Sequence, residues 1–449
     1  MGQARILSTS LFVLTTTLAL AGCGDQAKLP AGASMGANPE IPAPTESLIP
    51  TVNIAKAKGW TNGGMPAAGS GLKVAAFADN LDHPRNLYVL PNGDVLVAET
   101  NAPPKPEDGK GIKGWFMKLA YKRAGSTTPS ANRITLLRDT DGDGTPDQRS
   151  VFLDKLSSPY GMALIDNDLF VADSDALLRF PYHAGDTQIT AVGSKVTDLP
   201  AGPINHHWTK SLAASADGQH LYVGVGSNSN VGENGLEVEK DRASIWEIDP
   251  KTGSHRIFAS GLRNPAGLAI EPTSKALWAA VNERDELGSD LVPDYMTRVK
   301  DGGFYGWPFS YYGQHLDDRV KPQNPTLVSR ALVPGYALGP HTASLGLCSS
   351  YGTHLPEAFQ HGMFVGQHGS WNRKPYSGYK VVFVPFDNGK PAAQPVDVLT
   401  GFVDADGNAQ GRPVGIAIDN RGSLLVADDV GNKVWRVSAP SNAAASAAR

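Results

Sequence analysis

The sequence predicts an all-β protein built as a six-bladed β-propeller. One strand–turn–strand pattern returns six times along the chain, Gly and Pro are abundant (49 and 33 of 449 residues), and helical periodicity is weak throughout. Glycine and proline supply the turns that short antiparallel strands need. A β-sandwich also has many short strands, but it does not repeat one motif in this way, so radial repetition is favoured.

Each repeat consists of a Pro or polar lead, a short apolar strand, a turn with Gly, Asn or Asp, and a second apolar strand. In the first repeat, residues 83–90 contain the lead and first strand, 91–94 the turn and 95–98 the second strand. The other repeats span residues 159–172, 211–224, 265–279, 343–366 and 413–427. A further strand candidate follows each pair, so four-stranded blades fill residues 71–437 and leave no room for another domain.

The N-terminus is typical of an exported bacterial lipoprotein. Arg5 supplies a positive start, residues 6–20 are mostly apolar but too short for a good membrane span, and Leu20-Ala21-Gly22-Cys23 resembles a lipobox. In that pattern residues 1–23 form the signal peptide with its lipidated Cys. The alternative is an ordinary signal peptide with a chance Cys. We therefore expect an exported protein, lipid-anchored through Cys23 to the bacterial cell envelope and facing the periplasm.

Composition bounds the remaining segments and the partners. Residues 24–70 have few large apolar side chains and predict a flexible linker, and the Ala/Ser-rich residues 438–449 predict a disordered tail. With Cys23 lipidated, Cys348 is alone and no intrachain disulfide is possible. The net charge of −4, with no long basic run, argues against nucleic acid as a partner.

Polar residues stand directly before the first strand of most repeats. They are His83, Arg85, His206, His207, Arg263, Asn264, His341, Thr342 and Arg412. In a propeller these positions converge on the central axis, where several Arg and His side chains would repel one another unless an anion lay among them. The set therefore predicts a site for a polyanionic ligand. The alternative is that these side chains point outward or pair with nearby carboxylates.

Two stretches have the composition of metal sites. Glu283, Arg284 and Asp285 follow an apolar strand and offer carboxylates and carbonyls in one tight segment, which suits calcium. Asp139, Asp141 and Asp143 alternate around Gly142 like half of an EF-hand loop, without its distal Glu. The alternatives are a solvated loop and an Asp/Gly-rich turn that binds nothing.

Three motifs resemble a known family. Residues 261–269 (GLRNPAGLA), 282–285 (NERD) and 302–308 (GGFYGWP) resemble the sorbosone dehydrogenase family, which belongs with the soluble quinoprotein glucose dehydrogenases. The resemblance runs through most of residues 71–437. It implies a six-bladed propeller that uses pyrroloquinoline quinone (PQQ) and calcium.

The resemblance also implies roles for individual residues. It places the catalytic base at His207, with His206 as the alternative, and an Arg263–Asn264 pair beside the quinone carbonyls, where Arg263 would help to stabilise the developing oxyanion. It places calcium at backbone carbonyls of Glu283 and Arg284, although the glucose dehydrogenases have Gly-Pro there, so a carboxylate could replace a carbonyl. The remaining implied cofactor contacts are Thr342 with His341 beside it, Arg412, and, in place of a missing family Lys, His368, Arg373 or Lys374.

These residues predict a PQQ-dependent oxidoreductase that oxidises a sugar or aldehyde-sugar, such as an aldose or sorbosone, by hydride transfer to the quinone. Electrons would pass to a respiratory acceptor. The first alternative is a non-catalytic propeller that binds carbohydrate or protein. A calcium-dependent lactonase-type hydrolase is a further alternative, but it needs several acidic residues at the axis, where this chain has Arg and His.

Overall fold

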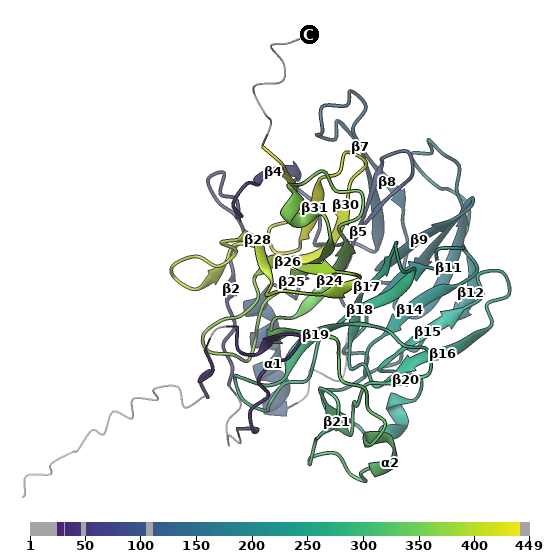
Figure 1. Cartoon of the computed structure of the whole chain (residues 1–449). Coiled ribbons are helices and arrows are strands. Elements are labelled where there is room, and N and C mark those ends of the chain that lie inside the picture. The colour runs from purple at the N-terminus through teal and green to yellow at the C-terminus, as the bar shows by residue number, and fades with distance from the viewer. Residues whose placement is uncertain (1–24, 31, 46–50, 105–110, 441–449) are drawn as a thin grey trace, which may run out of the picture.

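The computed structural model describes residues 25–30, 32–45, 51–104 and 111–440 (Figure 1). Its sheets form six blades around one axis. The first strands of the blades contact one another in a closed cycle, β5–β9–β13–β17–β24–β30 and back to β5. Each of these strands is the first strand of a predicted repeat, so the predicted six-bladed propeller is confirmed. The predicted signal peptide with Cys23, and residues 441–449 of the predicted tail, lie outside the described residues.

Blades 1 to 3 follow in chain order from the axis outward. Blade 1 has β5 (Pro84–Val89), β6 (Val95–Glu99), β7 (Arg133–Arg138) and β8 (Gln148–Leu153). Blade 2 has β9 (Gly161–Ile165), β10 (Asp168–Ala172), β11 (Ala176–Pro181) and β12 (Ser194–Asp198). Blade 3 has β13 (Lys210–Ala214), β14 (Leu221–Val225), β15 (Ser244–Ile248) and β16 (His255–Ser260), with β20 (Gly303–Phe304) at its edge.

Blades 4 to 6 recruit strands from the N-terminal part of the chain. Blade 4 has β17 (Pro265–Glu271), β18 (Ala276–Val281), β19 (Pro293–Arg298), β23 (Tyr336–Pro340) and β1 (Met35–Gly36). Blade 5 has β24 (Ser344–Ser349), β25 (Gly362–Gln367), β26 (Lys380–Asp387), β28 (Val396–Thr400) and β3 (Ala67–Ala68). Blade 6 has β30 (Pro413–Ile418), β31 (Leu424–Asp428), β32 (Lys433–Ser438) and β4 (Lys73–Ala78). Because β4 pairs with β32, strands from the two ends of the propeller close the ring.

The loops contain short strands and helices. The strands are β2 (Lys56–Ala57), β21 (Ser310–Tyr311), β22 (His315–Leu316), β27 (Lys390–Pro391) and β29 (Asn408–Ala409), and the helices are α1 (Gly111–Ala124), α2 (Pro325–Val328), η2 (Leu236–Glu239) and η3 (Glu357–Phe359). The helix α1 was not predicted; it is an insertion between β6 and β7. Within the described residues, none of the helices combines the length and apolarity that crossing a bilayer requires.

The core lies between neighbouring blades. Between blades 5 and 6, for example, Phe364, Phe383, Leu424 and Trp435 are buried in one cluster. Burying a large apolar side chain contributes about 1.5–3 kcal/mol. Stability therefore comes from contacts between blades, and the loops at the two ends of the propeller are available for function.

The strand order defines two faces. Each first strand starts at one face, and the second strand returns to it, so loops before first strands and loops between second and third strands lie together. We call this the site face. The turns between first and second strands, and between third and fourth strands, lie on the opposite face.

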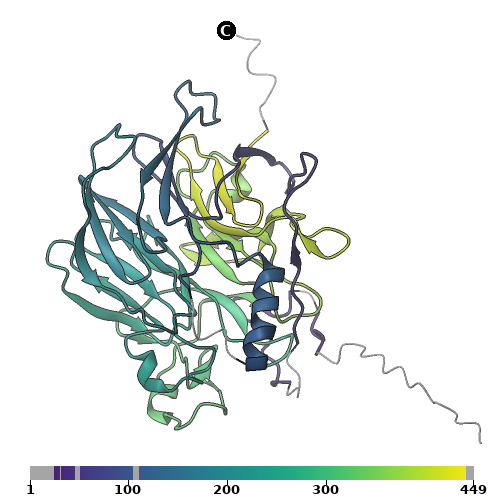
Figure 2. The ribbon, with the colours of Figure 1, turned by 180° about the vertical axis from the view of Figure 1, so that it is seen from behind.

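The segment predicted as a flexible linker, residues 24–70, is bound to the propeller where the structure describes it. β1, β2 and β3 pair with β23, β29 and β28. Residues 51–60, which we call the strap, cross the site face beside α1, and Figure 2 shows this helix next to the purple N-terminal segment. The strap holds its place through backbone pairing and polar contacts, which its low apolar content did not reveal.

Candidate active site

The site-face loops bring most of the predicted residues together around the axis. His83, His207, Arg263, His341 and Arg412 precede first strands, whereas Glu283, Asp285, His368 and Arg373 lie between second and third strands. Asp139, Asp141 and Asp143 lie between β7 and β8, on the opposite face. One predicted group is thus separated from the others by the length of a blade.

Asp429 links three of the predicted basic groups. Its Oδ2 atom accepts hydrogen bonds from Nη1 of Arg85 (2.6 Å) and Nε2 of His368 (2.8 Å), and Nε2 of His83 lies 3.8 Å away. Burial lowers the pKa of His368 to about 4, against the opposing effect of Asp429. His368 is therefore neutral near pH 7 and donates its Nε2–H to an ionised Asp429.

Arg412 is a fully buried cation with unused donors. Its side chain is 0% exposed, and Nη2 donates to the Ala55 carbonyl of the strap (3.2 Å). The guanidinium also lies 4.9 Å from the centre of the Tyr379 ring. Nε and Nη1 are buried without a hydrogen-bond partner among the described residues, as is Nε of Arg85. Such groups cost free energy unless an acceptor reaches them, so this cluster is suited to an anionic ligand.

His207 has a defined tautomer. Its Nδ1 atom lies 2.8 Å from the carbonyl of Ser227 and 3.0 Å from the hydroxyl of the same residue. A carbonyl can only accept, so Nδ1 carries the proton and Nε2 is the basic nitrogen. A side chain at Gly226 would meet Cβ of His207 at 2.4 Å and Oδ1 of Asn264 at 2.5 Å, which shows that these two predicted residues flank the same backbone position.

Arg263 is held by the loop after β18. It donates to the carbonyls of Asn282 (3.3 Å) and Glu283 (2.8 Å) through Nη1, and to the carbonyl and side chain of Asn230 through Nε (3.2 Å) and Nη2 (2.9 Å). These bonds use most of the N–H groups of a guanidinium. Arg263 is thus rigidly oriented, with Asn230 as its partner from the neighbouring blade.

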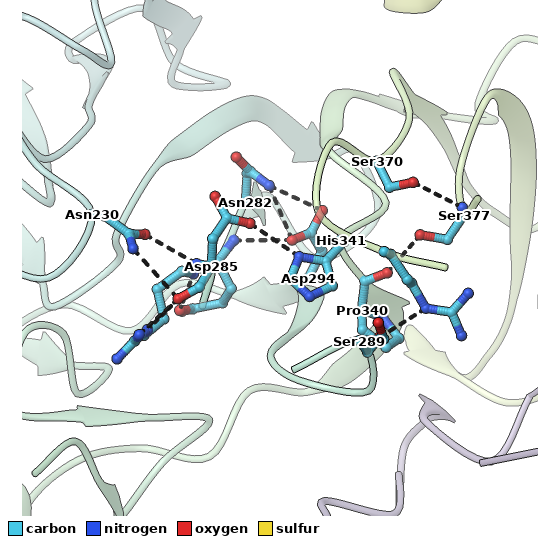
Figure 3. Close-up of polar contacts among 12 residues, drawn as sticks. Asn230, Asn282, Asp285, Ser289, Asp294, Pro340, His341, Ser370 and Ser377 are labelled. Atoms are coloured by element: carbon cyan, nitrogen blue, oxygen red, sulfur yellow. Dashed lines mark hydrogen bonds and ion pairs between the residues drawn. The ribbon is translucent and has the colours of Figure 1, made fainter. Parts of the chain in front are cut away.

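Figure 3 shows the adjoining network around Asp285, Asp294 and His341. Nδ1 of His341 lies 3.0 Å from Oδ1 of Asp285, and its Nε2 lies 2.9 Å from the carbonyl of Gly288. Burial lowers the pKa of His341, but the bond to Asp285 outweighs this and raises it. Thr342 donates to the buried Asp294 (3.0 Å), which also accepts the N–H of Glu283 (2.9 Å). Asp294 therefore holds the Thr342 hydroxyl in place, and a contact of Thr342 with a cofactor stays a prediction.

The loop 283–285 does not have the arrangement of a calcium site. The carbonyls of Asn282 and Glu283 accept from Arg263, and the Asp285 carbonyl accepts from Arg284 (2.9 Å). Arg284 itself forms a buried ion pair with Asp317. Guanidinium groups already supply the positive charge at these carbonyl oxygens, so the loop does not fit the predicted calcium ion at Glu283, Arg284 and Asp285.

In the second predicted metal site, three carboxylates lie close to one another. Asp139, Asp141 and Asp143 each offer an oxygen atom within 4.8 Å of the others, and within the described part of the chain they are the one group of this kind. Asp139 also accepts backbone N–H groups of Gly142 (2.8 Å) and Gly144 (2.7 Å). Calcium binding at this opposite-face turn stays a prediction.

Arg373 lies at the edge of the site. It donates to the carbonyls of Ser289 (2.9 Å) and Pro375 (3.0 Å), and lies 3.8 Å from Asp290. These contacts fix the loops of blades 4 and 5 to each other. A cofactor contact by Arg373 stays a prediction.

Comparison with known proteins places the chain in a family. Residues 68–370 match the family model described as "Domain of unknown function (DUF7133)", and residues 321–440 match the model described as TrAA12-like. The chain belongs to the DUF7133 family. An uncharacterized protein of Borreliella burgdorferi is 30% identical to the DUF7133 chain over 306 residues, which are 63% of the chain and 76% of that relative.

Two further comparisons concern one fungal enzyme. The pyrroloquinoline quinone-dependent pyranose dehydrogenase of Coprinopsis cinerea is 23% identical over 435 residues, 83% of the DUF7133 chain and 54% of the enzyme. The chain therefore spans about half the length of this relative. The solved holo form of the PQQ domain of C. cinerea pyranose dehydrogenase superposes with a TM-score of 0.65 at 20% identity, covering 86% of the chain and all of the domain. This likeness shows the fold.

Sequence reasoning missed several carboxylates and amides of the DUF7133 site, above all Asp429, Asp294 and Asn230. A signal for the first was present. A polar residue ends or follows the second strand in most repeats: Glu99, Asp173, Asn282, Gln367 and, in the last repeat, both Asp428 and Asp429. Because second strands end at the site face, this second ring of polar positions lies beside the ring before the first strands.

Replacing Asp429 by Asn should destabilise the DUF7133 chain. Removing one partner of a buried ion pair costs about 3–5 kcal/mol, and Asp429 is 2% exposed. Burial raises the pKa of Asp429, but His368, His83 and Arg85 outweigh this and lower it. Its contribution is therefore present above the unfolded value near about 4 and is lost as the pH falls through the folded value. Denaturant unfolding against pH should show a smaller acid-dependent loss in Asp429→Asn, whereas the exposed control Asp198→Asn should behave like the wild type.

Proposed function

We propose that this protein is a PQQ-dependent oxidoreductase that oxidises a sugar or aldehyde-sugar, of the aldose or sorbosone class, and passes electrons to a respiratory acceptor. Two findings support the proposal: the named activity of the Coprinopsis relative and the axial site. The observation that carries it is the buried Arg412, whose Nε and Nη1 atoms have no hydrogen-bond partner among the described residues. A buried cation of this kind is suited to a carboxylate ligand.

The donor set fits the cofactor. PQQ is a planar polycarboxylate with adjacent carbonyls, and Arg412 and Arg85 offer buried N–H groups that no other described residue accepts. Arginine is the side chain best suited to a carboxylate, because its N–H groups can bind both oxygens. Asp429 keeps Arg85 in place, and the neutral His368 adds no repelling charge. We propose that these residues hold the cofactor's carboxylates.

We assign proton transfer from the substrate to His207 and charge stabilisation to Arg263. When bound, PQQ accepts a hydride equivalent from the substrate carbon. His207 takes the hydroxyl proton on Nε2, since the carbonyl of Ser227 fixes the proton of the neutral ring on Nδ1 (2.8 Å). The hydrogen bond from Nδ1 to the Ser227 carbonyl also stabilises the imidazolium that forms when His207 takes the proton. Arg263, fixed by Asn230 and Glu283, supplies positive charge where negative charge develops.

Reconstitution with the cofactor tests the proposal. The purified chain, mixed with PQQ in a calcium-containing buffer, should show a stoichiometric bound-quinone spectrum that bleaches on addition of an aldose from a substrate panel, with reduction of an artificial dye. The Coprinopsis PQQ domain is the positive control. Failure to bind quinone at micromolar concentration would contradict the proposal and favour the non-catalytic carbohydrate- or protein-binding propeller.

A further inference from the structure

The first described residues are fixed to the site face. Asp25 accepts the backbone N–H of Ser289 on Oδ2 (2.7 Å) and the Ser289 hydroxyl on its carbonyl (2.9 Å). The N–H of Ala27 donates to the carbonyl of Lys374 (2.8 Å). Ser289 and Lys374 lie in the loops between second and third strands of blades 4 and 5, and Figure 3 shows Ser289 near His341, whose ring contacts the neighbouring Gly288 carbonyl. The described chain therefore starts beside the candidate active site.

Further contacts make this attachment rigid. Asp290 accepts the backbone N–H groups of Lys28 (2.6 Å) and Leu29 (3.2 Å). The hydroxyl of Thr51 in the strap donates to the Asp25 carbonyl (3.2 Å). The Asp25 side chain is 9% exposed. Residues 25–29 are thus attached by several hydrogen bonds to loops of the propeller.

The attachment leaves little chain between the propeller and Cys23. Asp25 follows Cys23 by two residues, which span at most about 7 Å when extended. A flexible linker over residues 24–70 would instead have given a root-mean-square reach of about 35–40 Å and free rotation of the propeller. A lipid on Cys23 would therefore bring the site face to the headgroup layer.

The surface next to this attachment suits a lipid headgroup region. On the strap, Val52 is 65% exposed, and on α1 Leu119 is 53% exposed. Lys118 and Lys122 of α1 are also exposed, and Nε of Arg123 donates to the Ile54 carbonyl (2.8 Å), which ties the helix to the strap. Exposed apolar side chains combined with basic ones are typical of segments that lie in the interface of an anionic bilayer.

We propose that the site face lies against an anionic bilayer surface, held by a lipid on Cys23 and contacted by the strap and α1. The proposal rests on the lipobox at residues 20–23. It does not depend on the identity of the cofactor. The mouth of the axial site then faces the membrane, and the opposite face, with the turn 139–147, points away from it.

Two labelled variants of the full lipidated chain test this orientation. Val52→Cys places a fluorophore on the site face, and Val192→Cys places one in the turn between β11 and β12 on the opposite face, where Val192 is 94% exposed. Both variants are made in a Cys348→Ser background, because Cys348 is only partly buried. The proteins are bound to phosphatidylethanolamine–phosphatidylglycerol vesicles that carry a headgroup nitroxide quencher.

Several-fold stronger quenching at position 52 than at position 192 is the expected result. Equal quenching, or stronger quenching at 192, overturns the orientation. A Cys23→Ser change in the Val52→Cys background should abolish quenching, and quenching that persists overturns the role of the lipid. The readout needs neither PQQ nor turnover, so loss of the enzymatic proposal leaves this test intact.

Discussion

Replacing Arg412 by Met should abolish quinone binding while leaving the apoprotein folded. The two effects separate because Arg412 is 0% exposed and two of its nitrogens have no partner in the described structure. Losing a buried charge pair with a ligand costs about 2–5 kcal/mol, or roughly 30- to 4,000-fold in affinity at about 1.4 kcal/mol per tenfold. Removing an uncompensated buried charge, in contrast, keeps or raises the melting temperature of the ligand-free chain.

Titration with quinone, followed by absorbance, measures the quinone affinity. Thermal unfolding without quinone measures the melting temperature of the same preparation. The matched control is Arg421→Met, since Arg421 lies on the opposite face and pairs with Asp139 (3.3 Å). It should change neither quantity strongly. Wild-type affinity in Arg412→Met would contradict the cofactor site, and a large fall in its melting temperature would show that Arg412 is a structural cation.

Replacing His207 by Ala should remove turnover and keep quinone binding. A positioned base contributes about 10²–10⁴-fold to a proton-transfer step, and the contact of Nδ1 with Ser227 assigns that function to Nε2. The expected result is a fall of that size in kcat for dye reduction with an aldose. Quinone titration should give an affinity close to that of the wild type.

The neighbouring His206→Ala is the control for this prediction, because it tests the alternative base directly. If His206→Ala loses turnover and His207→Ala does not, the assignment moves to His206. If both keep full activity, the base is a third group and the role of the Ser227 contact is structural. A variant that loses quinone affinity would place its histidine in cofactor binding.

The sequence analysis was most successful where the signal is local. Each predicted turn separates two apolar runs, and the predicted turns 91–94 and 420–422 do lie between β5 and β6 and between β30 and β31. Once the repeats are aligned, the residues before first strands must share one face, so His207, Arg263, His341 and Arg412 were predicted as a group. Predicting the turns and their common face required no knowledge of contacts between residues far apart in the chain.

It was least successful where residues far apart in the chain meet. Trp60 donates to Asp428 (2.7 Å) across 368 positions, and Arg412 reaches Ala55 across 357. No local pattern displays such contacts, so the strap was predicted as a linker. In the same way, the sequence indicated that residues 282–285 could bind a cation through their oxygen atoms. It did not indicate that the guanidinium of Arg263 would be that cation.

The pairing of β4 with β32 has a consequence for biogenesis. The outermost strand of blade 6, Lys73–Ala78, is translated before blades 1 to 5, and its third strand, Lys433–Ser438, is translated after them. Arg412 sits on this blade, so the axial cation arrives only with the last part of the polypeptide. A chain that lacked blade 6 would therefore form an open arc of blades without Arg412 at the axis.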